Sequence, residues 1–231
     1  MPIAAVLPQD TRPHAWNTAY ARGDNFVFYP HEEVLRFLAR HIRKRISANS
    51  FEDRLPDAAG LPILDVGCGI GRHMVTALDF GLEPYGFDLS DTAIATARRW
   101  LARCGVKDAD ARATTADIRC LPWQTGFFGC AVSHGVLDSM PFSVACAGMG
   151  EVARVLRADG LFYCDLVAGT AREETVTADH EHGTVQSYFD DAKIDALCGA
   201  HFAIIDKIRI DRHEYATDTT VSRWHVTLAK R

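Results

Sequence analysis

The chain has 231 residues, of which 48% are hydrophobic, and a formal net charge of −5 at pH 7. This length suits one domain with an appendage, and the apolar content is enough for a core of ordinary size. The acidic balance argues against a nucleic-acid partner bound through its phosphates. No segment approaches the roughly 20 apolar residues that span a bilayer, so we expect no membrane insertion.

The chain start and the cysteines indicate a cytoplasmic protein. Residues 1–8 lack a basic region and are interrupted by proline, so we expect no secretory signal. The seven cysteines are scattered, without a C-x-x-C pair or a zinc-binding spacing. We therefore expect reduced, partly buried thiols and no metal site.

Residues 31–46 are predicted to form a helix, because apolar side chains recur every four residues along one face. This face carries Val34, Leu38, Ile42 and Ile46. The basic run at 43–45 is expected to close the helix, where the helix dipole favours cations. Residues 1–30 are irregular and contain several aromatic side chains, and residues 47–61 are predicted to be a linker.

From residue 62 onward the pattern alternates between buried strands and helices. Strands are expected at 62–67, 83–88, 111–117, 128–134 and 161–167, and helices at 71–80, 91–104 and 143–156. Such alternation with short connections predicts a parallel sheet with helices on both faces. After a helix near 190–198, two long strands at 201–211 and 221–229 are expected to pair antiparallel at the sheet edge.

A glycine-rich loop follows the first strand. Gly67, Gly69 and Gly71 permit a tight turn and a close approach of the backbone to a ligand at a helix N-terminus. The dinucleotide fingerprint G-x-G-x-x-G would require glycine where this chain has Arg72. Asp65, two positions before the first glycine, could instead receive the ammonium group of a sulfonium amino acid. The spacing therefore disfavours NAD.

Acidic and polar residues also stand at the ends of the next three strands. Asp88 could accept both hydroxyls of a ribose. Asp117 could accept a hydrogen bond from the adenine amino group, and the Ile118 amide could donate one to the adenine ring. Residues 133–135 would lie near the reactive group. Ligands of doubly wound sheets bind outside the carboxyl ends of the strands. This succession of strand ends favours a nucleotide-containing cofactor.

In these residues the chain resembles class I S-adenosylmethionine-dependent methyltransferases, from about residue 62 to the C-terminus. The resemblance rests on the segments 64–72, Asp88, 117–118, 151–156 with 159–160, and 224–230. It implies an α/β fold with a doubly wound, seven-stranded, mainly parallel sheet and an antiparallel C-terminal strand. Residues 1–50 would then be a helical lid on a cofactor-binding domain at 51–231.

The chain departs from the family pattern in two places. Phe128 is followed by Gly129, where family members often have Phe-Asp. That position usually lies away from the cofactor. No Asn/Asp-Pro-Pro-Tyr motif follows the fourth strand, which removes the main support for methylation of DNA bases or glutamine side chains.

The resemblance implies that S-adenosylmethionine is the cofactor. The main-domain residues expected to bind it are Asp65, Gly67, Cys68, Gly69, Arg72, Asp88, Leu89, Asp117, Ile118, Ser133 and His134. Trp16 and Tyr20, one helical turn apart, could cover the methionine part or face the sulfonium. Alternatively, they simply pack the N-terminal segment on the core.

The reaction implied is an in-line displacement at the methyl carbon, in which the protein mainly aligns the reactants. His134 is the candidate base, because imidazole titrates near neutral pH, although its position often contributes only backbone contacts. The segment 177–189 is expected to form the acceptor wall. Candidate acceptor contacts are Asp138, which could instead orient a helix, and Arg172, His182 and Tyr188.

The leading interpretation is methyl transfer to an O- or N-nucleophile on a small molecule, releasing S-adenosylhomocysteine. One alternative is an enzyme that uses the cofactor without methylating, for example a cyclase or lyase. Another is a non-catalytic cofactor-binding module. A homodimer is compatible with the sequence, and the acceptor stays open between a sugar, a lipid precursor and a secondary metabolite.

Overall fold

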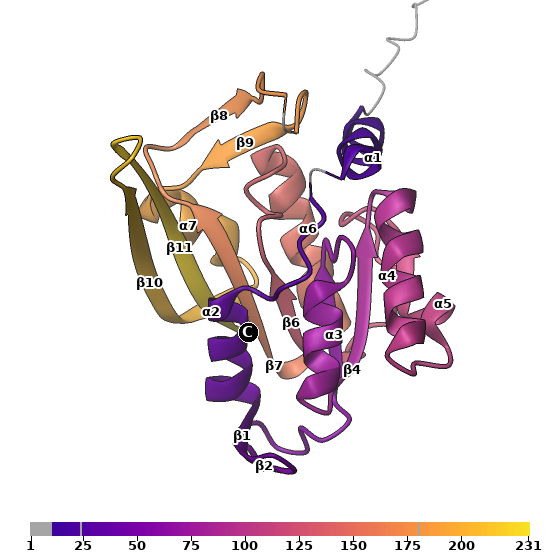
Figure 1. Cartoon of the computed structure of the whole chain (residues 1–231). Helices are drawn as coiled ribbons and strands as arrows, with labels where there is room; N and C mark the ends of the chain where they lie inside the picture. The colour runs from indigo at the N-terminus through magenta and orange to yellow at the C-terminus, as the bar shows by residue number, and fades with distance from the viewer. Residues whose placement is uncertain (1–10, 24, 180) are drawn as a thin grey trace, which may run out of the picture.

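A computed structural model describes residues 11–23, 25–179 and 181–231. Its centre is the predicted seven-stranded sheet, in the order β10-β11-β7-β6-β3-β4-β5 (Figure 1). The strands are β3 (Pro62–Val66), β4 (Glu83–Asp88), β5 (Ala113–Thr115), β6 (Phe128–Ser133), β7 (Leu156–Val167), β10 (Phe202–Glu214) and β11 (Thr219–Lys230). β3 to β7 run parallel, and β11 pairs antiparallel with both β7 and the edge strand β10.

Helices cover both faces of the sheet, as the alternating pattern predicted. They include α3 (Arg72–Asp79), α4 (Asp91–Arg103), α5 (Ala109–Arg112), α6 (Phe142–Val155) and α7 (Asp191–Cys198). Successive residues of β3 alternate between two cores. Leu64 packs with α6 and α7, whereas Ile63 packs on the opposite face with the N-terminal helices. Ser90 caps α4 as predicted, because its side chain accepts a hydrogen bond from the Ala93 amide.

Two strands differ in extent from the prediction. The third parallel strand is reduced to β5, because residues 109–112 form the short helix α5 instead. β7 begins at Leu156, directly after α6, and pairs there with Phe128. A register shift opposite Phe128–Cys130 accommodates Asp159, whose φ of 63° bends the strand.

The predicted helix at 31–46 is wrong beyond Ile42. The chain forms α2 (Glu32–Phe37), one π-helical segment η1 (Leu38–Ile42), and then a hairpin of β1 (Arg43–Ser47) and β2 (Ser50–Asp53). β1 replaces the end of the predicted helix, and β2 falls within the predicted linker. The basic run does lie against a helix C-terminus, but that helix is α3. Arg43 donates to the Phe80 carbonyl at 3.1 Å, and Arg45 donates to the Asp79 carbonyl at 2.5 Å.

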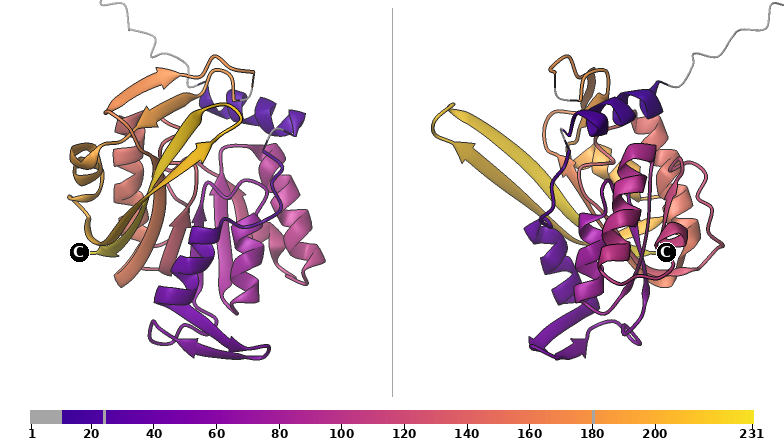
Figure 2. Two further views of the ribbon diagram at one scale, coloured as in Figure 1. Left: turned by 60° about the vertical axis from the view of Figure 1, so that its left-hand side comes forward. Right: turned by 45° about the vertical axis from the view of Figure 1, so that its right-hand side comes forward.

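Two smaller elements lie above the carboxyl ends of the parallel strands (Figure 2). One is α1 (Arg12–Arg22), which falls inside the segment predicted to be irregular. The other is a hairpin of β8 (Arg172–Thr175) and β9 (Val185–Tyr188). Residues 1–10, where we expect no secretory signal, lie outside the described residues, so the appendage is described only from residue 11.

Several expected absences can be compared with the described residues. No helix there is long and apolar enough to cross a membrane. All seven cysteines are free thiols. The described part of the chain holds no group of three or more His, Cys, Asp or Glu side chains arranged for a metal ion.

Candidate functional site

A cavity of about 250 Å³ lies at the carboxyl ends of β3, β4 and β6, beneath α1. Most of the predicted cofactor residues meet there. Those that line it are Trp16, Tyr20, Gly67, Cys68, Gly69, Arg72, Asp88, Leu89, Ile118 and His134. The fold therefore gathers residues more than a hundred positions apart, from Trp16 to His134, at a single edge of the sheet.

The glycine loop forms one wall of this cavity. Gly67 and Gly69 have φ values of 64° and 53°, which side-chain-bearing residues rarely adopt. A Cβ at Gly69 would also collide with the Tyr20 hydroxyl, and one at Gly67 with the side chain of Val136. Backbone conformation and close packing both require glycine here.

Asp88 stands at the tip of β4 on the cavity floor. Its Oδ2 accepts a hydrogen bond from the Gly69 amide at 3.0 Å, and its Oδ1 accepts one from the Ser90 amide at 2.9 Å. No cation bonds to this carboxylate among the described residues. Burial raises its pKa to about 6. Each oxygen keeps a lone pair for a ligand donor.

Asp65 is buried directly behind the glycine loop. Its Oδ2 has no hydrogen-bond partner in the described part of the chain, and its Oδ1 lies 3.9 Å from His73 Nδ1. Burial raises its pKa to about 8. A buried acceptor without a partner is costly, which fits a group that a ligand completes.

Two other predicted cofactor residues do not line the cavity. Ser133 is fully buried, and its Oγ has no partner within the described residues. Asp117 is held by arginines, with Arg12 and Arg119 each donating to its Oδ2 at 2.8 Å. Its carboxylate is thus already neutralised, and the geometry does not support the predicted contact to adenine. The neighbouring Ile118 does line the cavity.

α1 covers the cavity and is attached to three parts of the domain. Arg12 pairs with Asp117, and Asn17 accepts a hydrogen bond from the Ser90 hydroxyl at 2.8 Å. Arg22 reaches the Asp179 carbonyl in the β8–β9 loop at 3.3 Å. Tyr20 and Trp16 line the cavity and also pack on the core around Ile70, so both predicted roles fit the geometry.

His134 does not have the geometry of a general base. Arg72 lies 3.1 Å from its Nδ1, and its Nε2 lies 3.3 Å from Asp165 Oδ2. Since guanidinium only donates, Nδ1 must be the acceptor and Nε2 carries the proton. Burial, opposed by Asp165, lowers the pKa of His134 to about 3. The imidazole is neutral, and its single lone pair is already used by Arg72.

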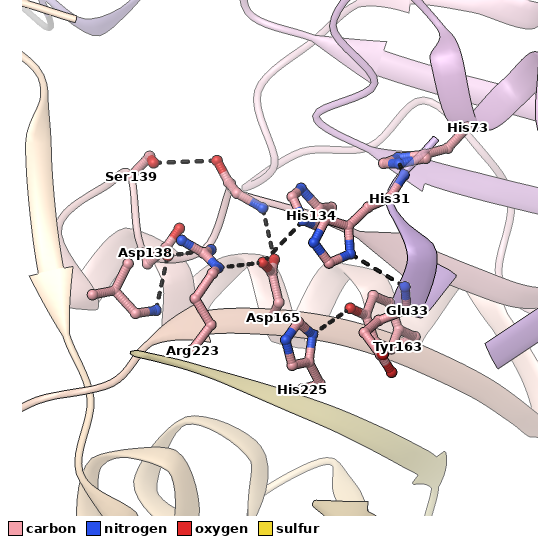
Figure 3. A network of polar contacts seen from close by, with 12 residues as sticks. His31, Glu33, His73, His134, Asp138, Ser139, Tyr163, Asp165, Arg223 and His225 are labelled. Carbon is pink, nitrogen blue, oxygen red and sulfur yellow. Dashed lines mark hydrogen bonds and ion pairs between the residues drawn. The ribbon is translucent and has the colours of Figure 1, made fainter. Parts of the chain in front are cut away.

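Behind His134 lies a buried ionic network (Figure 3). Arg223 of β11 donates to Asp165 Oδ2 at 2.6 Å and to Asp138 Oδ2 at 2.7 Å. Asp165 Oδ1 accepts a hydrogen bond from the Gly135 amide at 2.7 Å, and this bond fixes the loop after β6. Asp138 is only 1% exposed and does not reach the cavity, so its predicted acceptor contact is not supported.

The other predicted acceptor contacts also lie away from the cavity. Arg172 stacks over the Tyr188 ring, with its guanidinium carbon 3.5 Å from the ring centroid. Tyr188 donates to Glu174 at 2.7 Å, and His182 is exposed. The predicted acceptor wall instead contributes Glu181, from the loop between β8 and β9.

Several lining residues were not predicted. They are Arg12, Asn25, Val27, Ile70, His73, Phe87, Val136, Ser139, Met140 and Glu181. Glu181 lies within the predicted acceptor segment, and Val136 follows soon after the predicted fourth strand. The residues from the N-terminal segment carry no motif: Arg12 begins α1, and Asn25 and Val27 belong to the strap between α1 and α2 that crosses the strand ends.

Comparison with protein families agrees with this geometry. Residues 63–160 match the family described as "Methyltransferase domain". A sterol 4-C-methyltransferase of Caenorhabditis elegans is 27% identical over 147 residues, which cover 61% of this chain. The matched part spans only 40% of that relative's length.

Solved structures share the whole fold at low sequence identity. A 1,6-didemethyltoxoflavin-N1-methyltransferase of Burkholderia thailandensis, with its acceptor and S-adenosylhomocysteine bound, superposes with a TM-score of 0.66. It is 17% identical, and the match covers 100% of this chain and 92% of that one. The [4+2]-cyclase SpnF superposes with a TM-score of 0.62 at 18% identity, covering 95% and 93% of the two chains.

Proposed function

Because the chain belongs to the class I S-adenosylmethionine-dependent methyltransferases, we propose that it transfers a methyl group to an O- or N-nucleophile on a small molecule. The products would be the methylated acceptor and S-adenosylhomocysteine. The observation that carries the proposal is the pair of buried carboxylates, Asp65 and Asp88. Neither is bonded to a cation among the described residues. Asp88 lines the cavity beneath α1, and Asp65 is buried directly behind the glycine loop that forms one of its walls.

These residues fit the polar groups of S-adenosylmethionine. Asp88 would accept the ribose hydroxyls, and the unpaired Oδ2 of Asp65 would accept the ammonium group. The Arg72 guanidinium, held by His134, offers a positive charge to the carboxylate end. When bound, the cofactor supplies a methyl group activated by a sulfonium leaving group.

The rest of the chain's contribution is alignment and exclusion of water. Trp16 and Tyr20 of the lid close the cavity from above, which limits hydrolysis and strengthens local electrostatics. We assign this lid to residues 1–50 and the cofactor-binding domain to residues 51–231. Apolar side chains of Val27, Val136 and Met140 line the same cavity, and they favour an acceptor with an apolar body.

We further propose that catalysis does not use His134 as a base. Its lone pair is engaged by Arg72, so protonation would place two cations side by side in a buried site. An acceptor with a free nitrogen lone pair needs no base. An acidic hydroxyl could lose its proton to water before the methyl transfer.

The identity of the products tests this function. The full chain is incubated with S-adenosylmethionine and a panel that contains a sterol, an aza-aromatic heterocycle and a phenol. Formation of S-adenosylhomocysteine together with a methylated acceptor supports the proposal. Formation of methylthioadenosine, or conversion of an acceptor without cofactor consumption, indicates instead a non-methylating enzyme. The likeness in fold to a [4+2]-cyclase makes that second outcome worth measuring.

A further inference from the structure

A second cavity, of about 530 Å³, lies between the α2–η1 segment and the outer strands β7, β10 and β11. A layer of histidines separates it from the cofactor cavity. His134 lines the first cavity and His225 lines the second. His31 stacks between them, with its ring centroid 4.0 Å from that of His134 and 5.6 Å from that of His225 (Figure 3). The second cavity is therefore a separate site.

The wall of this cavity is basic although the chain is acidic. Four cationic side chains line it, against the two carboxylates of Glu33 and Asp206. The four are Arg36, Arg40, Lys44 and Arg54. The net charge of the lining is thus two positive, in a chain whose net charge is −5. Such a reversal of sign concentrates anions at the site.

The cations differ in how far they are already neutralised. Arg36 lies 3.2 Å from Glu33, and Arg40 lies 3.2 Å from Asp206. Arg54 pairs with Glu52, which does not line the cavity. Lys44 is exposed and forms no ion pair among the described residues. Arg36 also pairs with Glu32 at 2.5 Å, so the three arginines are neutralised and Lys44 is the lining cation left available to a ligand.

The floor of the cavity is apolar and aromatic. Phe37, Tyr163 and Ile208 line it together with His225. The Tyr163 hydroxyl lies 2.7 Å from His225 Nδ1, and burial lowers the pKa of His225 to about 4, so the ring is uncharged. Ile208 is 43% exposed on the β10–β11 hairpin. An apolar floor beneath a cationic wall suits a ligand with both characters.

The segment that bears the wall has an unusual conformation. η1 is π-helical over Leu38–Ile42, and it places Ala39, Arg40 and His41 on the cavity. π-helical turns are rare and frequently occur at functional sites. Phe37, the last residue of α2, directly precedes η1, so the junction of α2 and η1 provides both an apolar and a charged contact.

From these observations we propose that the second cavity binds an amphipathic anion. Its apolar or aromatic body lies over Phe37, Tyr163 and Ile208, and its carboxylate, sulfonate or phosphate group lies against Lys44. The volume is within the range of about 300–1,000 Å³ that is typical of small-molecule sites. This site is distinct from the cofactor cavity and does not depend on the proposed methyl transfer.

A fluorescence titration of the full chain tests the proposal. The probe is 1-anilinonaphthalene-8-sulfonate, and N-phenyl-1-naphthylamine is the same molecule without its anionic group. We expect saturable binding of one sulfonate probe per chain, weakened about fivefold or more by Lys44→Glu. Lys107→Glu is the matched control, because it makes the same charge change at an exposed lysine outside the cavity.

A second variant and a competition experiment complete the test. Ile208→Ser should weaken both probes, whereas Lys44→Glu should weaken only the sulfonate. Saturating S-adenosylmethionine should displace neither probe. Equal effects of Lys44→Glu and Lys107→Glu, or displacement by S-adenosylmethionine, would overturn the proposal. Binding of S-adenosylmethionine is measured separately by calorimetry, so failure here leaves the proposed function standing.

Discussion

Two pairs of buried aspartates lie near the strand ends, and they are compensated in different ways. Asp138 and Asp165 share the guanidinium of Arg223, which donates to both. Asp65 and Asp88 have no bonded cation among the described residues, and burial raises their pKa values to about 8 and about 6. At Asp165 burial is outweighed by the ion pair with Arg223, which lowers the pKa below the ordinary value, whereas at Asp138 burial outweighs Arg223 and raises the pKa to about 6.

The first pair of aspartates has a structural role, whereas the second pair is suited to binding a ligand. A buried carboxylate is costly unless it is paired, so the first pair is stable in the free chain. The second pair keeps free acceptor atoms in the cavity wall (Asp88) and directly behind the glycine loop (Asp65), where a cationic, hydrogen-bonding ligand can complete the pair. Buried groups with shifted pKa values cluster at functional sites for this reason. Removing the cation of the first pair should therefore destabilise the fold, whereas removing a carboxylate of the second pair should weaken ligand binding.

The largest effect is expected for Arg223→Leu. It would leave Asp138 and Asp165 buried without their cation, and loss of one partner from a buried ion pair costs about 3–5 kcal/mol. Urea unfolding measures the change in the free energy of unfolding. Arg212→Leu, at an exposed position of β10, is the control. A loss below about 1 kcal/mol would show that the network does not stabilise the fold.

Asp88→Ala should affect binding rather than folding. It removes the acceptor proposed for the ribose hydroxyls, so we expect the affinity for S-adenosylmethionine to fall about 100-fold, or about 2.7 kcal/mol. Calorimetry gives the affinity, and thermal unfolding shows whether the fold persists. Asp91→Ala changes an exposed aspartate at the start of α4 and should leave the affinity unchanged.

Asp65→Asn should stabilise the free chain and lower its affinity for S-adenosylmethionine about tenfold. Asp65 has a pKa of about 8 in the folded chain, well above its value in the unfolded chain. The folded state then binds the extra proton, so the free energy of unfolding falls as pH rises towards 8. Between pH 7 and pH 8, the wild type should lose stability that the Asn variant retains.

Denaturant unfolding at these two pH values measures that difference. Above pH 7 the unfolded histidines are already neutral, so their titration does not mask the effect. A wild-type chain and an Asn variant with the same pH dependence would mean that Asp65 is ionised and paired in the free protein. The asymmetry between the two pairs of aspartates would then disappear.

His134→Asn is expected to have the smallest effect. The amide oxygen can replace Nδ1 as the acceptor for Arg72, so kcat with any acceptor found in the panel should change less than about threefold. Loss of a general base would instead lower the rate about 10²–10⁴-fold. His134→Phe, which has no acceptor for Arg72, should raise the KM for S-adenosylmethionine and thereby separate positioning from proton transfer.

The sequence predicted the regular, locally encoded half of the molecule. The glycine loop, Asp88 and Ser90 each follow a buried strand, and this pattern fixes their place at one edge of a parallel sheet. The mainly parallel seven-stranded sheet and the antiparallel pairing of the two C-terminal strands at its edge were predicted as well.

Contacts between distant segments could not be predicted. Arg223 is an ordinary strand residue until β11 pairs with β7 and brings it to Asp165. From the sequence, Asp117 is a plausible ligand for adenine. In the structure α1 lies close by, and its Arg12 pairs with the Asp117 carboxylate. His134 has the side chain of a base, but its tautomer is set by Arg72, 62 positions away in the chain. In each case the partner, rather than the residue, decides the role.

The most direct test is a calorimetric titration of the full chain with S-adenosylmethionine at pH 8, with NADH as the comparison. We expect that one S-adenosylmethionine binds per chain, that NADH does not bind, and that Asp88→Ala loses the binding without losing its fold. No heat of binding for S-adenosylmethionine, or an unchanged affinity in a folded Asp88→Ala chain, would contradict this expectation.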